Sequence, residues 1–284
     1  MNSPSSPARS RARQLTVLAL GDSITDGGTQ HRAYRFHLHR LLKAEHRVHT
    51  RWVGSMQGVY DRRRGANATR GVHVVGAADW PVESQRHEGH WGWTAGQILR
   101  GHERQRQRGS LPGWLRALGS GEGSGTPPVG VVTLHVGTND LTKRVLKEGT
   151  SLATVARELR GIVRQLCRAL PRALVLLATL IPFCRVSATA GTLARRRRAI
   201  ERDYHSNVRA LCARPPSAAC AERRVICVNQ STLRCDELVD GVHPSSRGAE
   251  HMARNWLGAL HPHLHHVARS VQRPRDSTAQ ANKW

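Results

Sequence analysis

Five short apolar runs recur along the chain, and most end at small or polar residues. They cover Leu15–Leu20, Thr50–Gly54, Val129–Val136, Ala173–Leu180 and Val225–Asn229. Short apolar runs bounded by turn residues are typical of strands that are buried on both faces of a parallel sheet. We therefore expect five strands in one sheet.

Helical periodicity fills the spaces between these runs. Tyr34, Leu38, Leu41 and Leu42 share one helix face, and Thr94 is placed to cap a helix that continues through Leu99. Three longer helices are expected over Leu152–Leu170, Thr192–Cys212 and Ser246–His265. Because strands and helices alternate, the pattern predicts an α/β fold in which helices cover both faces of a parallel sheet.

Two stretches break this alternation. Residues 55–88 are rich in Gly and Arg and irregular, which predicts a long functional loop, and residues 119–128 read as a flexible surface insertion. We expect one domain over residues 15–268. A disordered basic tail (residues 1–14) precedes it and a disordered tail (residues 269–284) follows it.

The candidate chemistry lies at the predicted strand ends, where α/β sheets bind their ligands. Ser23 follows the first strand, Asn139 the third, and Asp240 and His243 the fifth. Singly, Ser23 and Asn139 could be helix caps and His243 a turn residue. Together, a serine, a histidine and an aspartate at converging strand ends are the set that makes a hydroxyl nucleophilic at neutral pH.

The roles follow from that chemistry. Ser23 would attack a carbonyl carbon, His243 would move the proton, and Asp240 would hold the imidazole tautomer. The oxyanion would be met by the Ser23 N–H, the Asn139 amide and the N–H of Gly92, which lies between Trp91 and Trp93 in "HWGWTAG". We expect a side chain at residue 92 to obstruct that approach.

Four sequence blocks carry a family resemblance. "GDSIT" at 21–25, the Gly92 segment, "GTND" at 137–140 and "DGVHP" at 240–244 resemble the four blocks of the SGNH (GDSL-type) hydrolases, in the family's order. The likeness runs from about residue 15 to residue 260. Within the superfamily, "HEGHWGWTAGQI", "WVGS" at 52–55 and "DGVHPSSRGAEHMARNWLGAL" are most similar to carbohydrate esterase family 3, a group of acetyl xylan esterases.

The resemblance implies a flavodoxin-like, three-layer α/β/α sandwich with a parallel five-stranded sheet. It implies a catalytic triad of Ser23, Asp240 and His243, an oxyanion hole of Ser23, Gly92 and Asn139, and neither a metal nor an organic cofactor. We add Asp22, Trp91 and Trp93 as candidate substrate contacts. An indole face can stack on a sugar or shape a small acyl pocket, and core packing is the open alternative for both tryptophans. The Arg-rich loop at 61–70 and the insertion at 119–128 depart from the family pattern.

The amino-acid composition limits the classes of binding partner that we expect. The formal net charge is +24, but nearly all of the 44 basic residues are arginines spread from end to end, so the charge does not by itself predict nucleic-acid binding. The basic run at 194–205 is better explained as a solvated helix face. His87 and His90 beside Glu88 lack the spacing of a metal site. The longest apolar run, 173–181, is too short to span a membrane.

The compartment stays open at this stage. No signal peptide is visible, so we expect either a cytoplasmic protein or, if the N-terminus is incomplete, a secreted one. The six cysteines all fall in the C-terminal half without metal-site spacing, which fits either disulfides or buried thiols.

The sequence leaves three functions in competition. The first is a serine esterase that removes acetyl groups from a small-molecule or polysaccharide ester. The second is a lipase- or thioesterase-like acyl hydrolase of the same fold; the absence of an extended apolar segment near the motifs favours short acyl groups over it. The third is a non-catalytic basic protein that binds polyanionic glycan or nucleic acid.

Overall fold

The centre of the molecule is a sheet that contains all five predicted strands. The computed structural model describes residues 13–29, 32–68, 80–119, 128–184, 190–216, 220 and 224–272. The five strands are β1 (Arg13–Gly21), β2 (Val48–Val53), β7 (Val131–His135), β8 (Leu174–Ala178) and β9 (Val225–Val228). They are parallel and lie in the order β2-β1-β7-β8-β9. This is the predicted flavodoxin-like arrangement.

Two short strands extend the sheet beyond the prediction. β1 pairs with β2 through Leu18, and its last residues, Leu20 and Gly21, then pair with β6 (Arg86–Gly89). β3 (Met56–Gln57) is antiparallel to β6. The predicted irregular loop at 55–88 therefore contains strands, including the hairpin of β4 (Val59–Asp61) and β5 (Ala66–Ala68). These strands have two to four residues each, too few for a recognisable alternation.

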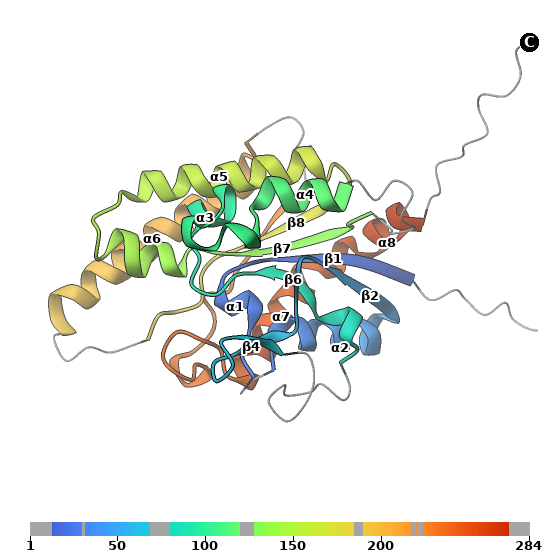
Figure 1. Ribbon diagram of the computed structural model, residues 1–284, viewed down its shortest axis with the longest axis horizontal. Coiled ribbons are helices and arrows are strands. Elements are labelled where there is room, and N and C mark those ends of the chain that lie inside the picture. The colour runs from blue at the N-terminus through green and yellow to red at the C-terminus, as the bar shows by residue number, and fades with distance from the viewer. Residues whose placement is uncertain are drawn as a thin grey trace, which may run out of the picture.

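Helices cover both faces of the sheet (Figure 1). One layer holds α3 (Ala95–Arg100), α4 (Leu111–Gly119), α5 (Leu152–Ala169) and α6 (Ala190–Ala213). The other holds α2 (Tyr34–His46), α7 (Ser246–Leu260) and α8 (Leu264–Gln272). The short α1 (Ser23–Asp26) and four short 3₁₀ segments connect these elements: η1 (Val82–Gln85), η2 (Glu103–Arg108), η4 (Cys235–Glu237) and η5 (His261–His263). η3 (Asp140–Val145) is one π-helical stretch.

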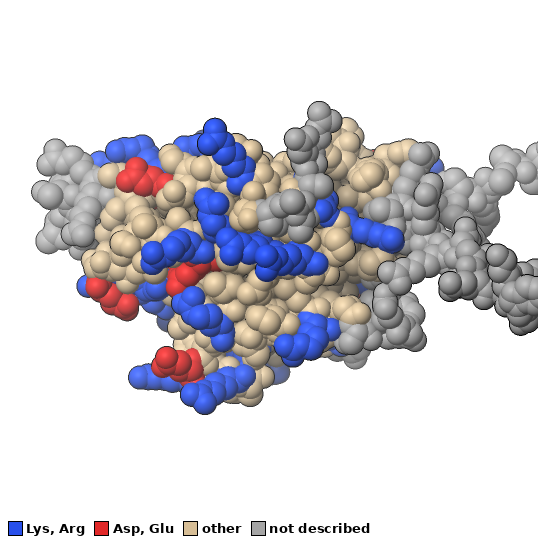
Figure 2. Space-filling view, turned by 90° about the horizontal axis from the view of Figure 1, so that it is seen from above, with Lys and Arg blue, Asp and Glu red and all other residues tan. Residues whose placement is uncertain are grey.

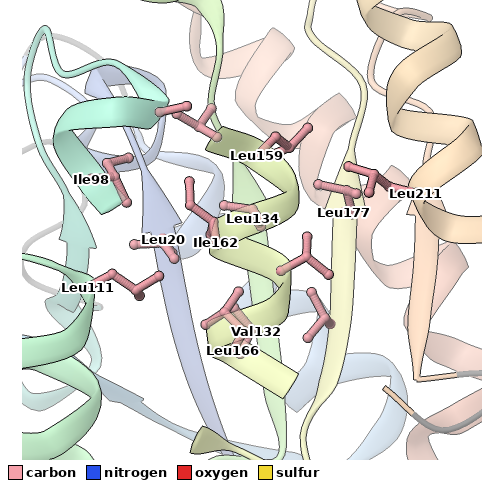
Figure 3. Packing of buried hydrophobic residues seen from close by; sticks show 14 of the residues in the cluster. Leu20, Ile98, Leu111, Val132, Leu134, Leu159, Ile162, Leu166, Leu177 and Leu211 are labelled. Atoms are coloured by element: carbon pink, nitrogen blue, oxygen red, sulfur yellow. The ribbon is translucent and has the colours of Figure 1, made fainter. Parts of the chain in front are cut away.

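Two hydrophobic clusters hold the layers together. β1 contributes Leu18 and Leu20 to the cluster under α5, and Leu15, Val17 and Ala19 to the cluster under α2 and α7. Successive strand side chains point to opposite faces, so a strand covered on both faces is apolar almost throughout. Figure 3 shows the first cluster, where the α5 side chains meet those of the strands.

The C-terminal helix differs from its prediction. A helix from Ser246 to His265 is expected, but α7 ends at Leu260 and the chain passes through η5 before α8 begins. Pro262 lies in that turn, and proline lacks the N–H that would continue the helix. α8 continues to Gln272, and β1 begins at Arg13, so both elements enter segments predicted as tails. The rest of both predicted tails lies outside the described residues. Among the described helices, none is both long and apolar enough to cross a membrane.

All six cysteines form disulfides, which the sequence left undecided. The pairs are Cys167–Cys220, Cys184–Cys235 and Cys212–Cys227. Two of these bonds join α5 and α6 to the segment around β9, and the third lies beside the candidate site. The C-terminal half is thus cross-linked at three places.

One buried charge joins segments that are far apart in the sequence. The Arg35 side chain of α2 is fully buried and donates hydrogen bonds of 2.8–2.9 Å to four backbone carbonyls. These carbonyls belong to Thr25, Asp26, Gly58 and Gln85. Its guanidinium also lies 5.0 Å from the ring centre of the buried Trp80.

We expect Arg35→Met to lower the free energy of unfolding by roughly 3–5 kcal/mol, because it leaves several buried carbonyls without a donor. Arg35→Lys should recover only part of the loss, since an ammonium cannot reproduce the planar fork. Urea denaturation measures both. Arg40→Met, on the exposed side of the same helix, is the matched control. Equal unfolding midpoints for Arg35→Met and Arg40→Met would contradict this role of Arg35.

Candidate active site

The candidate nucleophile lies on a sharp turn at the end of β1. Asp22 caps α1 by accepting a 3.0 Å hydrogen bond from the Ile24 N–H, so Ser23 is the first residue of that helix rather than its cap. A Cβ on Gly21 would lie 2.1 Å from the His135 carbonyl oxygen. The close strand packing therefore requires glycine before the turn. Ser23 is 7% exposed, so its side chain reaches the surface only through a pocket.

A chain of hydrogen bonds joins Ser23, His243 and Asp240. Ser23 Oγ lies 2.9 Å from His243 Nε2, and His243 Nδ1 lies 2.8 Å from Asp240 Oδ2. A carboxylate can only accept, so Nδ1 carries the hydrogen and Nε2 is left to accept from the serine hydroxyl. The structure thus brings the three side chains together in one hydrogen-bonded series.

The local loop keeps Asp240 ionised. Burial opposes ionisation of the carboxyl, but hydrogen bonds from the His243 N–H, the His243 ring and the Val242 N–H outweigh it. The pKa of Asp240 therefore lies below its ordinary value. An anionic Asp240 fixes the imidazole tautomer across the neutral pH range.

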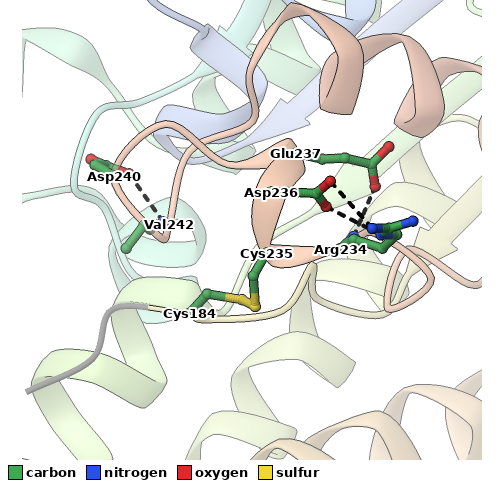
Figure 4. The surroundings of a disulfide bond; sticks show 7 residues. All are labelled: Cys184, Arg234, Cys235, Asp236, Glu237, Asp240 and Val242. Carbon is green, nitrogen blue, oxygen red and sulfur yellow. Dashed lines mark hydrogen bonds and ion pairs between the residues drawn. A yellow bond between two sulfur atoms is a disulfide. The ribbon is translucent and has the colours of Figure 1, made fainter.

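A disulfide anchors the loop that carries Asp240 and His243. Cys235, in the turn just before the loop, is bonded to Cys184, which follows β8 (Figure 4). The Cys184 N–H also donates a 2.7 Å hydrogen bond to the Gly241 carbonyl, and the Val239 N–H donates to the His243 carbonyl at 2.9 Å. The loop that carries Asp240 and His243 is therefore tied both to itself and to the end of a neighbouring strand.

The Gly92 and Asn139 segments lie against each other. The Asn139 amide donates a 2.9 Å hydrogen bond to the Trp93 carbonyl, and Lys143 Nζ donates a 3.0 Å bond to the Gly92 carbonyl. Asn139 precedes η3, but its side chain makes no capping bond, so the alternative reading as a helix cap does not hold. Thr94 caps α3 as predicted, in a full capping box with Gln97.

The backbone conformation gives a reason of its own for glycine at residue 92. A Cβ there would meet only Lys143 Nζ, at 3.4 Å, so the protein itself leaves room for a side chain. The backbone φ of Gly92 is +79°, a conformation that residues with a Cβ seldom adopt. The chain turns at Gly92, so the side chains of Trp91 and Trp93 point into different parts of the structure.

Those tryptophans have different surroundings. Trp91 lines the pocket and stacks on His243 with ring centres 5.0 Å apart, and it stacks on Tyr60 at 4.6 Å. Trp93 is 1% exposed, stacks on His90, and donates its indole N–H to Gln105 at 3.0 Å.

Two of the three predicted substrate contacts are corrected by this placement. Trp93 belongs to the hydrophobic core, and Asp22 is fully buried beneath the turn, so neither side chain lines the pocket. Of these three predicted contacts, only Trp91 lines the pocket.

The pocket beside Ser23 has a volume of about 460 Å³. Some residues of the pocket wall have been described above. Most of the others were not predicted from the sequence. The missed residues are Gly27, Gly28, Thr29, Arg32, Ala33, Tyr34, Tyr60, Asp61, Arg62, Arg63, Val239, Pro244 and Ala249. Most belong to loops or short strands without periodicity; the one available signal was the Gly- and Arg-rich composition of residues 55–70. Among the described residues, no group of three or more His, Cys, Asp or Glu side chains could hold a metal ion.

Comparison with known proteins decides the family. The model of the GDSL-like lipase/acylhydrolase family matches residues 19–251. The chain belongs to this family. It is therefore a carboxylic ester hydrolase with the GDSL hydrolase fold. No curated protein matches the chain.

Solved structures share the fold of this GDSL hydrolase. A family 3 carbohydrate esterase from Clostridium thermocellum is 22% identical, with a TM-score of 0.61 over 90% of this chain and 100% of that one. A family 3 carbohydrate esterase from Talaromyces cellulolyticus is 20% identical, with a TM-score of 0.58 over 91% and 100%. Est24, a carbohydrate acetylesterase from Sinorhizobium meliloti, is 13% identical, with a TM-score of 0.55 over 87% and 99%.

Two buried carboxyls lie directly behind the site of this GDSL hydrolase. Burial raises the pKa of Asp22 to about 7, partly against the hydrogen bond from the Ile24 N–H, and nearby Asp140 raises it further. Burial likewise raises the pKa of Asp140 to about 6, although Ala95 N–H and Arg144 donate to it. Asp22 Oδ2 has no hydrogen-bond partner among the described residues.

We expect Asp22→Asn to change the pH dependence of stability. The folded-state pKa of Asp22 is raised, so the folded protein holds this proton more tightly and loses stability as pH rises from about 4 to about 7. The asparagine keeps the cap oxygen but cannot ionise. Its stability relative to wild type should rise by about 2–3 kcal/mol between pH 5 and pH 8, measured by urea denaturation. A constant difference across that range would contradict the assignment.

Proposed function

We propose that this hydrolase is a serine esterase that removes short acyl groups, acetyl in particular, from carbohydrate. The observation that carries the proposal is the hydrogen-bonded series from Ser23 Oγ through His243 to Asp240. It provides a hydroxyl, a base that can take its proton, and an anion that orients the base.

The reaction follows from this arrangement in two steps. Ser23 Oγ attacks the ester carbonyl while His243 Nε2 takes its proton, and the tetrahedral intermediate collapses as His243 returns that proton to the leaving alcohol. Water then attacks the acyl-enzyme with the same histidine as base. The acid is released, and the Ser23 hydroxyl is restored.

The oxyanion is met by three N–H groups: the backbone N–H of Ser23, the backbone N–H of Gly92 and the amide of Asn139. One Asn139 hydrogen is donated to the Trp93 carbonyl, which fixes the amide plane and leaves the second hydrogen for the oxyanion. Lys143 holds the Gly92 peptide through its carbonyl. Donors that are fixed before the reaction need no reorganisation when the charge develops.

Three observations support a short acyl group on carbohydrate. The pocket is small, about 460 Å³, and its wall combines arginines and aromatic rings with apolar residues such as Ala33, Val239 and Ala249. Tyr60 and Trp91 expose aromatic surface of the kind that contacts sugars. The structural neighbours include carbohydrate esterases and a carbohydrate acetylesterase. The three disulfides further support folding in an oxidising compartment.

We expect wild-type protein to hydrolyse p-nitrophenyl acetate and to release acetate from acetylated xylan. Ser23→Ala should lower kcat/KM by about 10⁴-fold or more, because it removes the hydroxyl that is hydrogen-bonded to His243 and forms the proposed acyl-enzyme. Activity is followed by nitrophenolate absorbance and acetate release. Equal rates for wild type and Ser23→Ala would reject the serine mechanism, and a preference for octanoyl over acetyl esters would favour a lipase-like enzyme.

We expect Asn139→Ala to lower kcat by about 10²–10³-fold with little change in KM, because the lost donor acts on the developing oxyanion. Steady-state kinetics on p-nitrophenyl acetate give both constants. Thr142→Ala is the matched control in the next turn; its hydroxyl donates only to the Thr138 carbonyl, so activity should stay within about twofold of wild type. An unchanged kcat for Asn139→Ala would remove this residue from the oxyanion hole.

A further inference from the structure

The wall of the catalytic pocket carries an unusual charge. Arg32, Arg62 and Arg63 line the same pocket as Ser23 and His243. The acidic side chains that line it are Asp61 and Asp240. Asp240 is hydrogen-bonded within its own loop, and Asp61 is fully buried at the base of a turn. The pocket therefore presents three guanidinium groups beside one exposed carboxylate, that of Asp240, which is already hydrogen-bonded to His243.

The β4–β5 hairpin holds two of these arginines in place. Its four-residue loop, Arg62–Gly65, follows Asp61, whose carbonyl accepts from the Arg64 N–H at 3.2 Å. The Asp61 carboxylate accepts from the Arg63 N–H at 2.9 Å, and Gly65 has a φ of +64°. An aspartate before the turn and a glycine after it are the residues that such a loop requires.

The hairpin is also fixed to the turn that carries the nucleophile. The Tyr60 N–H donates to the Gly27 carbonyl at 3.2 Å, and the Thr29 N–H donates to the Tyr60 carbonyl at 3.1 Å. Asn67, on the second strand, donates to Asp26 Oδ1 at 3.0 Å. The arginine-bearing loop is therefore part of the wall of the site rather than a detached surface loop.

The three consecutive arginines of this loop differ in their surroundings. Arg64 Nε lies 3.5 Å from Asp61 Oδ2, so its charge is balanced within the turn, and it does not line the pocket. Arg62 and Arg63 make no ion pair with any carboxylate of the described residues. Arg32, on the preceding loop, likewise makes no such pair, and its guanidinium lies 4.7 Å from the Phe36 ring centre. Three charges are thus left for a ligand.

We propose that this pocket selects esters whose sugar carries an anionic group, a carboxylate or a sulfate, bound by Arg62 and Arg63 with Arg32. The inference rests on the proposed esterase function and names its substrate class. Guanidinium groups match planar oxyanions with paired hydrogen bonds, and a cleft lined by one sign of charge concentrates ligands of the opposite sign. Neutral xylan leaves these three charges without a partner.

The test compares acetate release from three acetylated sugars: galacturonate, galactose sulfate and neutral galactose. Wild type should favour at least one anionic sugar over the neutral one by about tenfold in kcat/KM. The preferred anion distinguishes carboxylate from sulfate. The preference should shrink when NaCl is raised from about 0.05 M to about 0.5 M, because the arginines are exposed and salt screens them. Equal kcat/KM for all three sugars would overturn the inference while leaving the esterase intact.

Two variants test which arginines produce the preference for anionic sugars. Arg62→Gln with Arg63→Gln should lower the ratio of anionic to neutral kcat/KM by about tenfold. Arg64→Gln, the matched control on the same turn, should keep the wild-type ratio, because its charge is already paired with Asp61. Equal ratios in the double variant and the control would exclude the loop as the anion site.

A binding measurement keeps the inference testable without turnover. Calorimetry with the Ser23→Ala protein and galacturonate oligosaccharides, or sulfated galactose oligosaccharides, should show an affinity about tenfold above that for neutral galactose oligosaccharides. The gain should disappear in the Arg62→Gln/Arg63→Gln background. If esters are not cleaved but this selectivity is present, the proposed reaction fails and the anion site stands. If the selectivity is absent, the anion site fails whatever the activity.

Discussion

The buried guanidinium of Arg35 is the contact on which the site's geometry depends. Its four carbonyl partners lie in α1, the helix that begins at Ser23, in the turn before the arginine-bearing hairpin, and in the segment that leads into β6. Burial lowers the pKa of Arg35 to about 10, so the group stays charged at neutral pH. The dipoles of four backbone carbonyls surround this charge, whereas burial raises the pKa of the nearby Asp26 to about 8, so that carboxyl is mostly protonated at neutral pH. A charge that is so enclosed leaves those carbonyls little freedom to move.

This constraint extends to His243 through aromatic rings. Arg35 fixes the backbone at Gly58, the next strand places Tyr60, Tyr60 stacks on Trp91, and Trp91 stacks on His243. On the other side, the disulfide at Cys184 holds the loop that carries His243. The imidazole is therefore positioned from two directions. One series of contacts begins at the buried Arg35 of α2, and the other begins at the Cys184–Cys235 disulfide, which follows β8.

Much of this arrangement could be predicted from the sequence, because its signals are local. Apolar runs that end in "GDS" or "GTND" identify strand ends, and strand ends of a parallel sheet converge. Arg35 could not be found in this way. It lies among many basic residues on a helix, and its burial depends on carbonyls supplied by segments distant in sequence. Trp91 and Trp93 are equally indistinguishable in sequence, since the positive φ of Gly92 that separates them is a three-dimensional property. The β4–β5 hairpin was missed because strands of three residues carry no periodic signal.

The same limit explains why net charge was a poor guide to function. Arginine occurs in three physical settings here: buried and bonded to carbonyls, lining the pocket, and exposed on the outer helices. Figure 2 shows the face of α3–α6, where Lys and Arg greatly outnumber Asp and Glu. Arg157, Arg160, Arg164 and Arg168 form an exposed row along α5.

Like charges on neighbouring helices repel, and this self-repulsion works against a compact state. The disulfides Cys167–Cys220 and Cys212–Cys227 lie where this matters, because they anchor α5 and α6. These disulfides thus hold the helices that carry the outer arginines in place against the repulsion between their charges. The charge in the pocket, by contrast, lies beside Ser23, where the proposed anionic ligand would balance it. Position in the fold, rather than the total of +24, determines what each arginine does.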